Sequence, residues 1–448
     1  MYLFLFLYFC SIVSNEFEMK KGLLKISVIL LIAVIGYFTY SYIKENITVY
    51  DHKVVICIPV YGQSYALGEE AIRITDFDSL RIKYDGRIVT EHMDYVFGYF
   101  DHSSRIKQYI KRLLHYDKKA YELSLYGMAE ILIPQLGKDT IVCIFPGGHG
   151  MNTIAALMKP VEPYEKFIKE IAYAHKKAVD RGWDFYVPAV CWMQGESDIV
   201  DYPNKDYKTQ FHKMYNNLNN DIKSITHQHE NIKMICYQTS VITKGEHYKP
   251  NNYQALEPRI PTAQMELIQE DSFIWASGPT YPYHFVKESL HIDAIGQKNI
   301  GALAAISAMR IIRHETPVIG LMPIDFIVSA SQIRIPFHVP YPPLCFDTIS
   351  VRKADNYGFN VIRKDNTDII SSISINKDTV IINCKESPLD CKLRYAINGD
   401  YMKGGCLFGP RGNLRDSQGD NKTIAISGKK YPLHNWCYQF DHLCTPNK

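Results

Sequence analysis

The stretch that decides the fold runs from Val54 to Glu70 and reads VVICIPVYGQSYALGEE. Residues Val54 to Val60 form an unbroken apolar run, which is typical of a strand buried on both faces of a sheet. Gly62, Gln63 and Ser64 then interrupt the run. Because ligands of open α/β sheets bind outside the carboxyl ends of the strands, Ser64 is a candidate nucleophile. The alternative is a serine that only caps the following helix.

Alternating strands and helices follow this stretch. The predicted strands are 54–60, 140–145, 183–192, 233–239 and 272–276, and the predicted helices are 118–136, 163–181, 205–225, 260–269 and 294–314. This alternation predicts a parallel, doubly wound sheet. Right-handed crossovers would gather the loops that follow the strands at one edge of that sheet.

The pattern changes near Glu315. Alternating or β-branched runs at 324–339, 348–362, 373–384 and 392–397 predict a small antiparallel, β-sandwich-like domain. Its aromatic residues Trp436, Tyr438 and Phe440 alternate as strand residues do, so we expect them to pack in a core. A chain of 448 residues exceeds what one core usually organises. We therefore expect a leader at 1–45, an α/β domain at 50–314 and the β domain at 315–448.

The leader has the composition of a targeting segment. Lys20 and Lys21 precede the apolar residues Leu23 to Phe38, as a positive region precedes the hydrophobic region of a signal sequence. Met19 is the expected start, and no small-residue cleavage site stands out at 37–42. An uncleaved membrane anchor and a cleaved signal peptide both remain open. In either case the chain is expected to be exported, as an anchored, periplasmic or secreted protein.

The net charge and the cysteine positions limit the kinds of partner and cofactor that the sequence suggests. The net charge of +3 and the absence of a long basic run in the folded part do not suggest a nucleic acid partner. Four cysteines fall in predicted strands, where cysteine behaves as a small hydrophobic residue. Six more lie in the last quarter, and their pairing cannot be read from spacing. No spacing typical of a zinc site occurs, so neither a metal nor another cofactor is expected.

Two further groups suggest hydrolytic chemistry at the same sheet edge. Glu288 and His291 could supply the carboxylate and imidazole that a nucleophilic serine requires, although this spacing also occurs by chance. Backbone N–H groups of Ser64 and of the loop at 147–150, together with the side-chain amide of Gln194, could form an oxyanion hole. Glu196 and Asp198 are expected to hold their loop in place.

Three motifs in this order resemble those of the sialate O-acetylesterase-like carbohydrate esterases, which belong to the SGNH (GDSL-like) hydrolase superfamily. The motifs are Gly62-Gln63-Ser64, Trp192-x-Gln194-Gly195-Glu196-x-Asp198, and the acid-x-x-His of Glu288 to His291. The resemblance covers about 53–313. It implies that Ser64 is the nucleophile, His291 the base, Glu288 its orienting acid and Gln194 an oxyanion donor. Gln63 would support the loops.

The chain departs from the family pattern at three places. Glu288 stands where the family more often has Asp, Tyr65 where it has Asn, and Gly150-Met151-Asn152 where it has Gly-Gly-Thr. Both Gly148 and Gly150 therefore stay candidates for the oxyanion N–H. The resemblance also implies a three-layer α/β/α fold with a five-stranded parallel sheet.

The expected function is that of a serine esterase that removes O-acetyl groups from a carbohydrate through an acyl-enzyme intermediate. Two alternatives stay open at this point. One is an O-acyltransferase that uses the same site, and the other is a non-catalytic glycan-binding surface protein, because fold does not imply function.

Overall fold

The computed structural model describes residues 31–37, 52–90, 121–200, 206–244 and 257–446. The chain divides into two compact units, Met1–Asp51 and His52–Lys448. In the first unit, residues 31–37 are helical. Within the described ranges, no helix is both long and apolar enough to cross a membrane. The rest of the predicted leader, including most of its apolar segment, lies outside these ranges.

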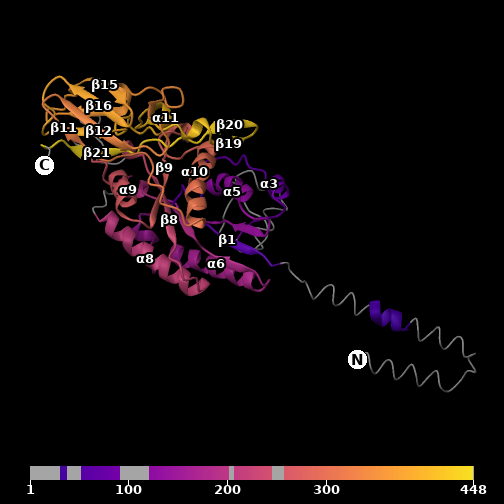
Figure 1. Cartoon of the computed structure of the whole chain (residues 1–448). Coiled ribbons are helices and arrows are strands. Elements are labelled where there is room, and N and C mark those ends of the chain that lie inside the picture. Colours follow the sequence, from indigo (N-terminus) through magenta and orange to yellow (C-terminus); the bar gives the residue numbers. More distant parts are fainter. Residues whose placement is uncertain (1–30, 38–51, 91–120, 201–205, 245–256, 447–448) are drawn as a thin grey trace, which may run out of the picture. The chain divides into compact units, whose positions relative to one another are not determined.

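A parallel sheet forms the centre of the second unit (Figure 1). All five predicted strands are present, and three of them consist of two consecutive pieces. The strands are β1 (Val54–Cys57) with β2 (Val60–Gly62), β4 (Thr140–Cys143) with β5 (Pro146–Gly148), β6 (Asp184–Tyr186) with β7 (Ala189–Met193), β8 (Lys233–Gln238) and β9 (Ile274–Pro279). Their order is β3-β4-β1-β6 in one part and β5-β2-β7-β8-β9 in the other. The short edge strand β3 (Ile88–Val89) was not predicted.

Helices cover both faces of this sheet, as the alternating burial of its central strand requires. Val55 and Cys57 pack into one hydrophobic cluster, whereas Ile56 and Ile58 pack into another. The helices are α3 (Phe77–Lys83), α5 (Ser124–Leu132), α6 (Glu162–Val179), α7 (Glu196–Val200), α8 (Tyr207–Thr226), α9 (Arg259–Glu270) and α10 (Ala294–Ile312). Residues of α6, α8 and α9 belong to the first cluster, and residues of α5 and α10 to the second. The predicted three-layer α/β/α arrangement is confirmed.

The C-terminal region consists of small antiparallel sheets. One contains β10 (Met322–Pro323), β11 (Ile327–Val328), β12 (Gln332–His338), β15 (Ile370–Asn376) and β16 (Thr379–Cys384); another contains β14 (Phe359–Ile362), β17 (Lys392–Tyr395) and β21 (Phe440–Leu443). Two-stranded sheets are formed by β13 (Cys345–Phe346) with β18 (Leu414–Arg415), and by β19 (Thr423–Ile426) with β20 (Lys429–Pro432). The apolar run at 373–384 is a hairpin of β15 and β16, which turns at Lys377.

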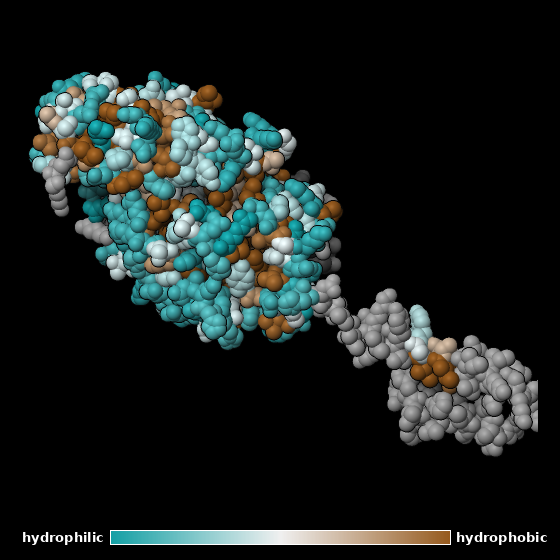
Figure 2. All heavy atoms as spheres, in the orientation of Figure 1, coloured by the Kyte–Doolittle hydropathy of each residue, from teal (hydrophilic) through white to brown (hydrophobic). Residues whose placement is uncertain are grey.

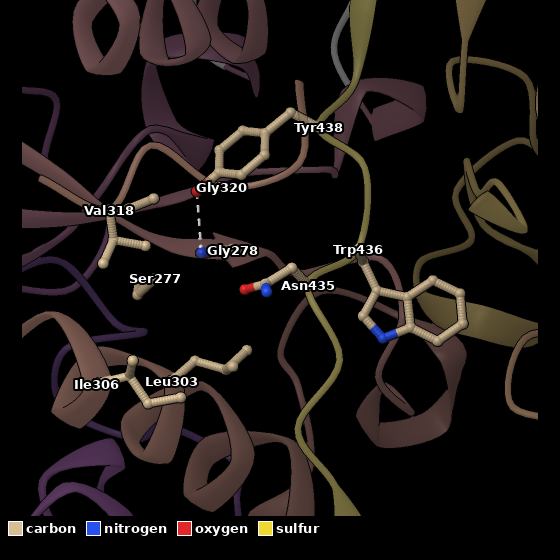
Figure 3. A pocket seen from close by; sticks show the side chains of 10 residues that line it. Ser277, Gly278, Leu303, Ile306, Val318, Gly320, Asn435, Trp436 and Tyr438 are labelled. Atoms are coloured by element: carbon tan, nitrogen blue, oxygen red, sulfur yellow. Dashed lines mark hydrogen bonds between the residues drawn. The ribbon is translucent and has the colours of Figure 1, made fainter. Parts of the chain in front are cut away.

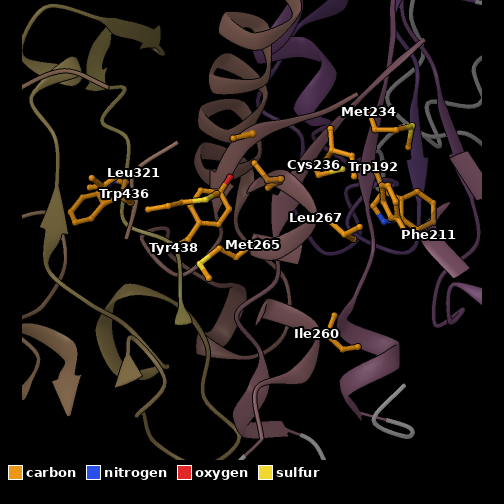
Figure 4. Packing of buried hydrophobic residues seen from close by; sticks show 14 of the residues in the cluster. Trp192, Phe211, Met234, Cys236, Ile260, Met265, Leu267, Leu321, Trp436 and Tyr438 are labelled. Carbon is orange, nitrogen blue, oxygen red and sulfur yellow. The ribbon is translucent and has the colours of Figure 1, made fainter. Parts of the chain in front are cut away.

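The C-terminal region and the α/β region share one hydrophobic core. Figure 4 shows Trp192 and Phe211 of the α/β region in the same cluster as Trp436 and Tyr438. The three aromatic residues Trp436, Tyr438 and Phe440 are all buried, as expected. Since His52–Lys448 forms one compact unit, a division into two domains at residue 315 stays a prediction.

A small cavity lies where the two regions meet (Figure 3). Its walls include Leu303 of α10 and Trp436 of the C-terminal region, and the backbone N–H of Gly278 donates to Tyr438 Oη over 2.9 Å. Its volume of about 10 Å³ is close to that of one water molecule, so it is too small for a substrate.

The surface hydropathy and the burial of the cysteines are those expected of a folded globular protein. Hydrophilic residues dominate the face drawn in Figure 2, with hydrophobic residues in scattered patches. The ten described cysteines are free thiols, and only Cys345 among them is not fully buried. Burial raises the pKa of the Cys191 thiol to about 12, which keeps it protonated and unreactive.

Candidate active site

Ser64 and His291 are in direct contact at the carboxyl edge of the sheet. Ser64 follows β2 in a tight turn, in which the Glu69 N–H donates to the Ser64 carbonyl over 3.0 Å. The Ser64 Oγ lies 2.7 Å from Nε2 of His291, and the serine is only 3% exposed. His291 comes from the loop between β9 and α10. The fold therefore brings together the two side chains that the sequence placed at this edge.

The carboxylate beside His291 belongs to Glu70. Its Oε2 lies 2.7 Å from Nδ1 of His291, on the side of the ring opposite Ser64. Glu288 instead receives a hydrogen bond from Lys403 Nζ over 3.1 Å. This geometry corrects the expected pairing of Glu288 with His291. Two consecutive left-handed residues, Lys287 and Glu288 (φ 52° and 53°), interrupt the regular backbone just before the histidine.

Sequence reasoning missed Glu70 because no regular spacing links it to the histidine. The residue lies at the end of the turn that begins with Ser64, at φ 65°, a backbone conformation that non-glycine residues seldom adopt. The signal in the sequence that could have identified Glu70 was weak: it is an acidic residue shortly after the candidate nucleophile Ser64. An acid three residues before the histidine is a stronger pattern, but it says nothing about where the side chain is directed.

The glycine loop after β5 lies against β2, the strand that precedes Ser64. The His149 N–H donates to the Gly62 carbonyl over 3.1 Å. Gly148 has φ 114°, and a Cβ atom there would come within 1.8 Å of the Gly62 oxygen, so only glycine fits. Within the described part of the chain, the N–H groups of Ser64 and Gly150 have no hydrogen-bond acceptor. Both could therefore serve as oxyanion donors, and the choice between Gly148 and Gly150 stays a prediction.

The amide of Gln194 is fully buried and already bonded. Its Nε2 donates to Asp198 Oδ2 over 2.5 Å and to the Asn152 carbonyl over 3.3 Å, while Oε1 accepts from Tyr207 over 3.2 Å. A side-chain amide has two N–H donors, and both have partners here. These contacts join neighbouring loops, and the role of Gln194 in an oxyanion hole stays a prediction.

Gln63 and Asp198 connect the loops around Ser64. Gln63 Oε1 accepts from the N–H groups of Gly195 and Ser197, over 3.4 and 3.2 Å. Asp198 Oδ2 also accepts from the Ile154 N–H over 2.9 Å. The loops that follow three neighbouring strands are thus tied together by side-chain acceptors.

Glu196 lies beneath the site in a buried group of aromatic residues. Both of its carboxylate oxygens are 2.7 Å from Tyr237 Oη, and burial raises its pKa to about 7 against the opposing effect of the Tyr237 and Thr239 hydrogen bonds. Tyr65 stacks on Tyr237 with ring centroids 5.7 Å apart, and its own ring is 5.4 Å from that of His291. A continuous set of contacts therefore links Glu196 to the histidine.

This arrangement defines a class of protein. A serine, a histidine and a carboxylate in consecutive hydrogen-bond contact, at the carboxyl edge of a parallel sheet, are the arrangement that serine hydrolases use. Among the described residues, no cluster of three or more His, Cys, Asp or Glu side chains could hold a metal ion.

Residues 126–310 match the family model described as carbohydrate esterase, sialic acid-specific acetylesterase. The matched part contains Gln194 and His291, whereas Ser64 and Glu70 precede it. For this part of the chain, the resemblance predicted from the motifs is confirmed. None of the curated proteins compared with the chain matches its sequence.

Solved structures with a similar fold include a carbohydrate acetylesterase from Xanthomonas citri, with 15% identity and a TM-score of 0.45. The match covers 66% of this chain and 65% of that protein, so this chain spans about two thirds of the length of that relative. NanS matches with 14% identity and a TM-score of 0.41, over 60% of this chain and 100% of that one. A protein from Arabidopsis thaliana matches with 16% identity and a TM-score of 0.41, over 57% and 98%.

Proposed function

We propose that the protein is a serine esterase that removes O-acetyl groups from a carbohydrate through an acyl-enzyme intermediate. The observation that carries this proposal is the series of contacts from Glu70 to His291 to Ser64, with 2.7 Å at each step. The family match over residues 126–310 supports a carbohydrate substrate and makes an O-acetylated sialic acid the first candidate.

The first half-reaction transfers the acetyl group to Ser64. His291 Nε2 takes the proton of Ser64 Oγ while Oγ attacks the acetyl carbonyl carbon. Glu70 holds the ring so that Nδ1–H faces the carboxylate and Nε2 faces the serine. The tetrahedral intermediate collapses as the C–O bond to the sugar breaks, and the sugar oxygen takes the proton from His291. Acetyl-Ser64 and a free sugar hydroxyl result.

The second half-reaction releases acetate. His291 removes a proton from water, the hydroxide attacks the acetyl carbon, and Ser64 Oγ leaves with the proton that His291 returns. The Glu70 side chain is 49% exposed, whereas the His291 side chain that it contacts is only 8% exposed. We favour hydrolysis over transfer to a second sugar because residues 126–310 match a family described as acetylesterases.

Acetate release from 4-nitrophenyl acetate and from an O-acetylated sialic acid tests this function, with the full chain beside Ser64→Ala. The matched control is Ser374→Ala, which removes the hydroxyl of an exposed serine on β15. We expect full activity in the control and loss of catalysis in Ser64→Ala. A wild-type protein that is no faster than Ser64→Ala on both substrates would refute the esterase.

We further propose that the apolar segment near the amino terminus directs export of the protein and either anchors it or is removed. Its support is the positive-then-apolar composition of residues 20–38. Cell fractionation of the full chain beside a chain that begins at Tyr50 tests this. Equal recovery of both chains in the cytoplasm would exclude it, and the mass of the exported protein would separate cleavage from anchoring.

A further inference from the structure

A loop of the C-terminal region lies directly on the loop that carries His291. We call residues 283–292 the histidine loop and residues 399–409 the bracing loop. The Gly404 N–H donates to the Glu288 carbonyl over 2.9 Å, and the Cys406 N–H donates to the Tyr283 carbonyl over 3.0 Å. These bonds join backbone to backbone across more than a hundred residues of sequence, so they hold the two loops in a fixed relation.

The histidine loop needs such support because its backbone is unusual. Lys287 and Glu288 both adopt left-handed conformations, which are sparsely populated for residues other than glycine. Such residues persist where the surroundings determine their conformation. Glu288 is the residue that the bracing loop contacts twice, through the Gly404 N–H and through the ion pair with Lys403.

Two consecutive glycines allow this close approach. A Cβ atom on Gly404 would lie 2.4 Å from both the Phe285 ring and the Ser289 oxygen. A Cβ atom on Gly405, which has φ 82°, would lie 2.7 Å from the Phe285 ring and the Tyr283 oxygen. Any side chain at either position would push the histidine loop away.

The other side of the histidine loop is held by the residue next to the nucleophile. Tyr65 Oη donates to the Leu290 carbonyl over 2.5 Å. The bracing loop is itself closed by the Asp400 N–H, which donates to the Phe408 carbonyl over 2.8 Å. It is also tied to the loop after β8, because Thr243 Oγ1 donates to the Lys403 carbonyl over 2.9 Å. The histidine loop is therefore clamped between Tyr65 and Gly404–Gly405.

We propose that the bracing loop is a positioning element of the active site: it fixes the histidine loop so that His291 contacts Ser64 and Glu70 at the same time. The proposal rests on the proposed esterase function for its kinetic consequence. The C-terminal region then supports catalysis through the backbone N–H groups of Gly404 and Cys406 and the close packing of Gly405, none of which contacts a reacting atom.

The test uses Gly404→Ala and Gly405→Ala in the full chain, with Gly428→Ala as the matched control. Gly428 is, like Gly405, a left-handed glycine of the C-terminal region (φ 79°), but no atom outside its chain neighbours lies within 4 Å of its Cβ position. Hydrogen exchange of peptides covering 280–293 reports the order of the histidine loop without any assay of activity. Steady-state kinetics and labelling of Ser64 by a fluorophosphonate report the alignment of the serine and histidine.

We expect faster exchange in the histidine loop of both glycine variants, with exchange in β8 unchanged. A displacement of about 1 Å in a catalytic group can cost about 100-fold in rate, so kcat should fall about 10- to 100-fold and KM should change less than about threefold. Serine labelling should slow in parallel with kcat. The control should match the wild type in all three measurements.

A gentler pair of variants covers the case in which a glycine variant does not fold. Lys403→Gln removes the ion pair with Glu288 and should raise loop exchange and lower kcat modestly, whereas Lys403→Arg should restore both. The proposal is overturned if folded glycine variants keep wild-type exchange and kcat, or if Lys403→Gln and Lys403→Arg behave alike. A wild type without esterase activity would refute the proposed function, while the exchange data would still decide whether the loop is braced.

Discussion

His291 Nδ1 lies 2.7 Å from the carboxylate of Glu70, a residue in the same turn as Ser64. The candidate nucleophile and the carboxylate beside the histidine thus come from one short segment, whereas the histidine lies more than two hundred residues further along the chain. Any movement of the histidine loop therefore changes both contacts together.

Glu70→Gln is expected to lower kcat by about 10- to 1,000-fold, because the amide cannot favour the imidazole tautomer and charge that a carboxylate stabilises. The fall in kcat should be smaller than about 1,000-fold, because the Glu70 side chain is half-exposed and water and salt screen its charge. Glu288→Gln is the comparison variant: it removes only the ion pair with Lys403, so its kcat should fall modestly, by no more than about fivefold, as for Lys403→Gln. The opposite ranking of the two variants would restore Glu288 as the orienting acid.

Gln194→Ala is expected to act mainly on stability. Loss of the amide removes a donor from buried Asp198, which should lower the free energy of unfolding by about 1–3 kcal/mol. Urea unfolding measures the loss of stability, and steady-state kinetics of the folded variant measure any effect on catalysis. A fall in kcat of about 100- to 1,000-fold, with unchanged KM, would instead identify Gln194 as an oxyanion donor.

Glu196→Gln is expected to change how stability depends on pH. The pKa of Glu196 is raised by burial to about 7, so the folded protein holds a proton that the unfolded chain releases near its ordinary pKa. The wild type should therefore lose up to about 3 kcal/mol of unfolding free energy as the pH rises from about 4.5 to 7, and no more above that range.

In Glu196→Gln, residue 196 cannot ionise. The free energy of unfolding of this variant should therefore lack the fall between about pH 4.5 and 7 that Glu196 causes in the wild type. Urea unfolding at several pH values between 4.5 and 8 compares the two proteins. Parallel curves for wild type and Glu196→Gln would mean that Glu196 does not titrate in this window.

Lys298→Met is expected to lower the free energy of unfolding by about 3–5 kcal/mol. Lys298 Nζ donates to Glu130 Oε1 over 2.9 Å and to Thr75 Oγ1 over 3.2 Å, in a buried cluster that joins α5 and α10 to the segment after Glu70. Removal of the ammonium leaves the Glu130 carboxylate without its buried partner.

An exposed ion pair provides the control for this prediction. Lys176 and Asp180 lie on the surface of α6, and Lys176→Met should cost less than about 1 kcal/mol. Thermal and urea unfolding measure both variants. Similar small losses for Lys176→Met and Lys298→Met would mean that water reaches the Lys298 cluster.

The residue pattern alone predicted the layers of the α/β region and two of the three side chains that meet at the candidate site, Ser64 and His291. An apolar run such as Val54–Val60 predicts a strand that is buried on both faces. Ser64 follows this run closely, and His291 precedes the last helix of the α/β region. Their meeting at one edge follows from the handedness of the crossovers. The burial of Trp436 and Tyr438 was likewise predictable from their alternation.

Only the tertiary structure decided which acid faces His291 and what the C-terminal region does beside it. The directions of Glu70 and Glu288 depend on left-handed backbone conformations in loops, and no periodic pattern encodes these. The contact of Gly404 and Gly405 with the histidine loop joins residues more than a hundred positions apart. Local sequence specifies strands and helices through periodic burial, whereas the direction of a loop side chain is set by distant segments that pack against it.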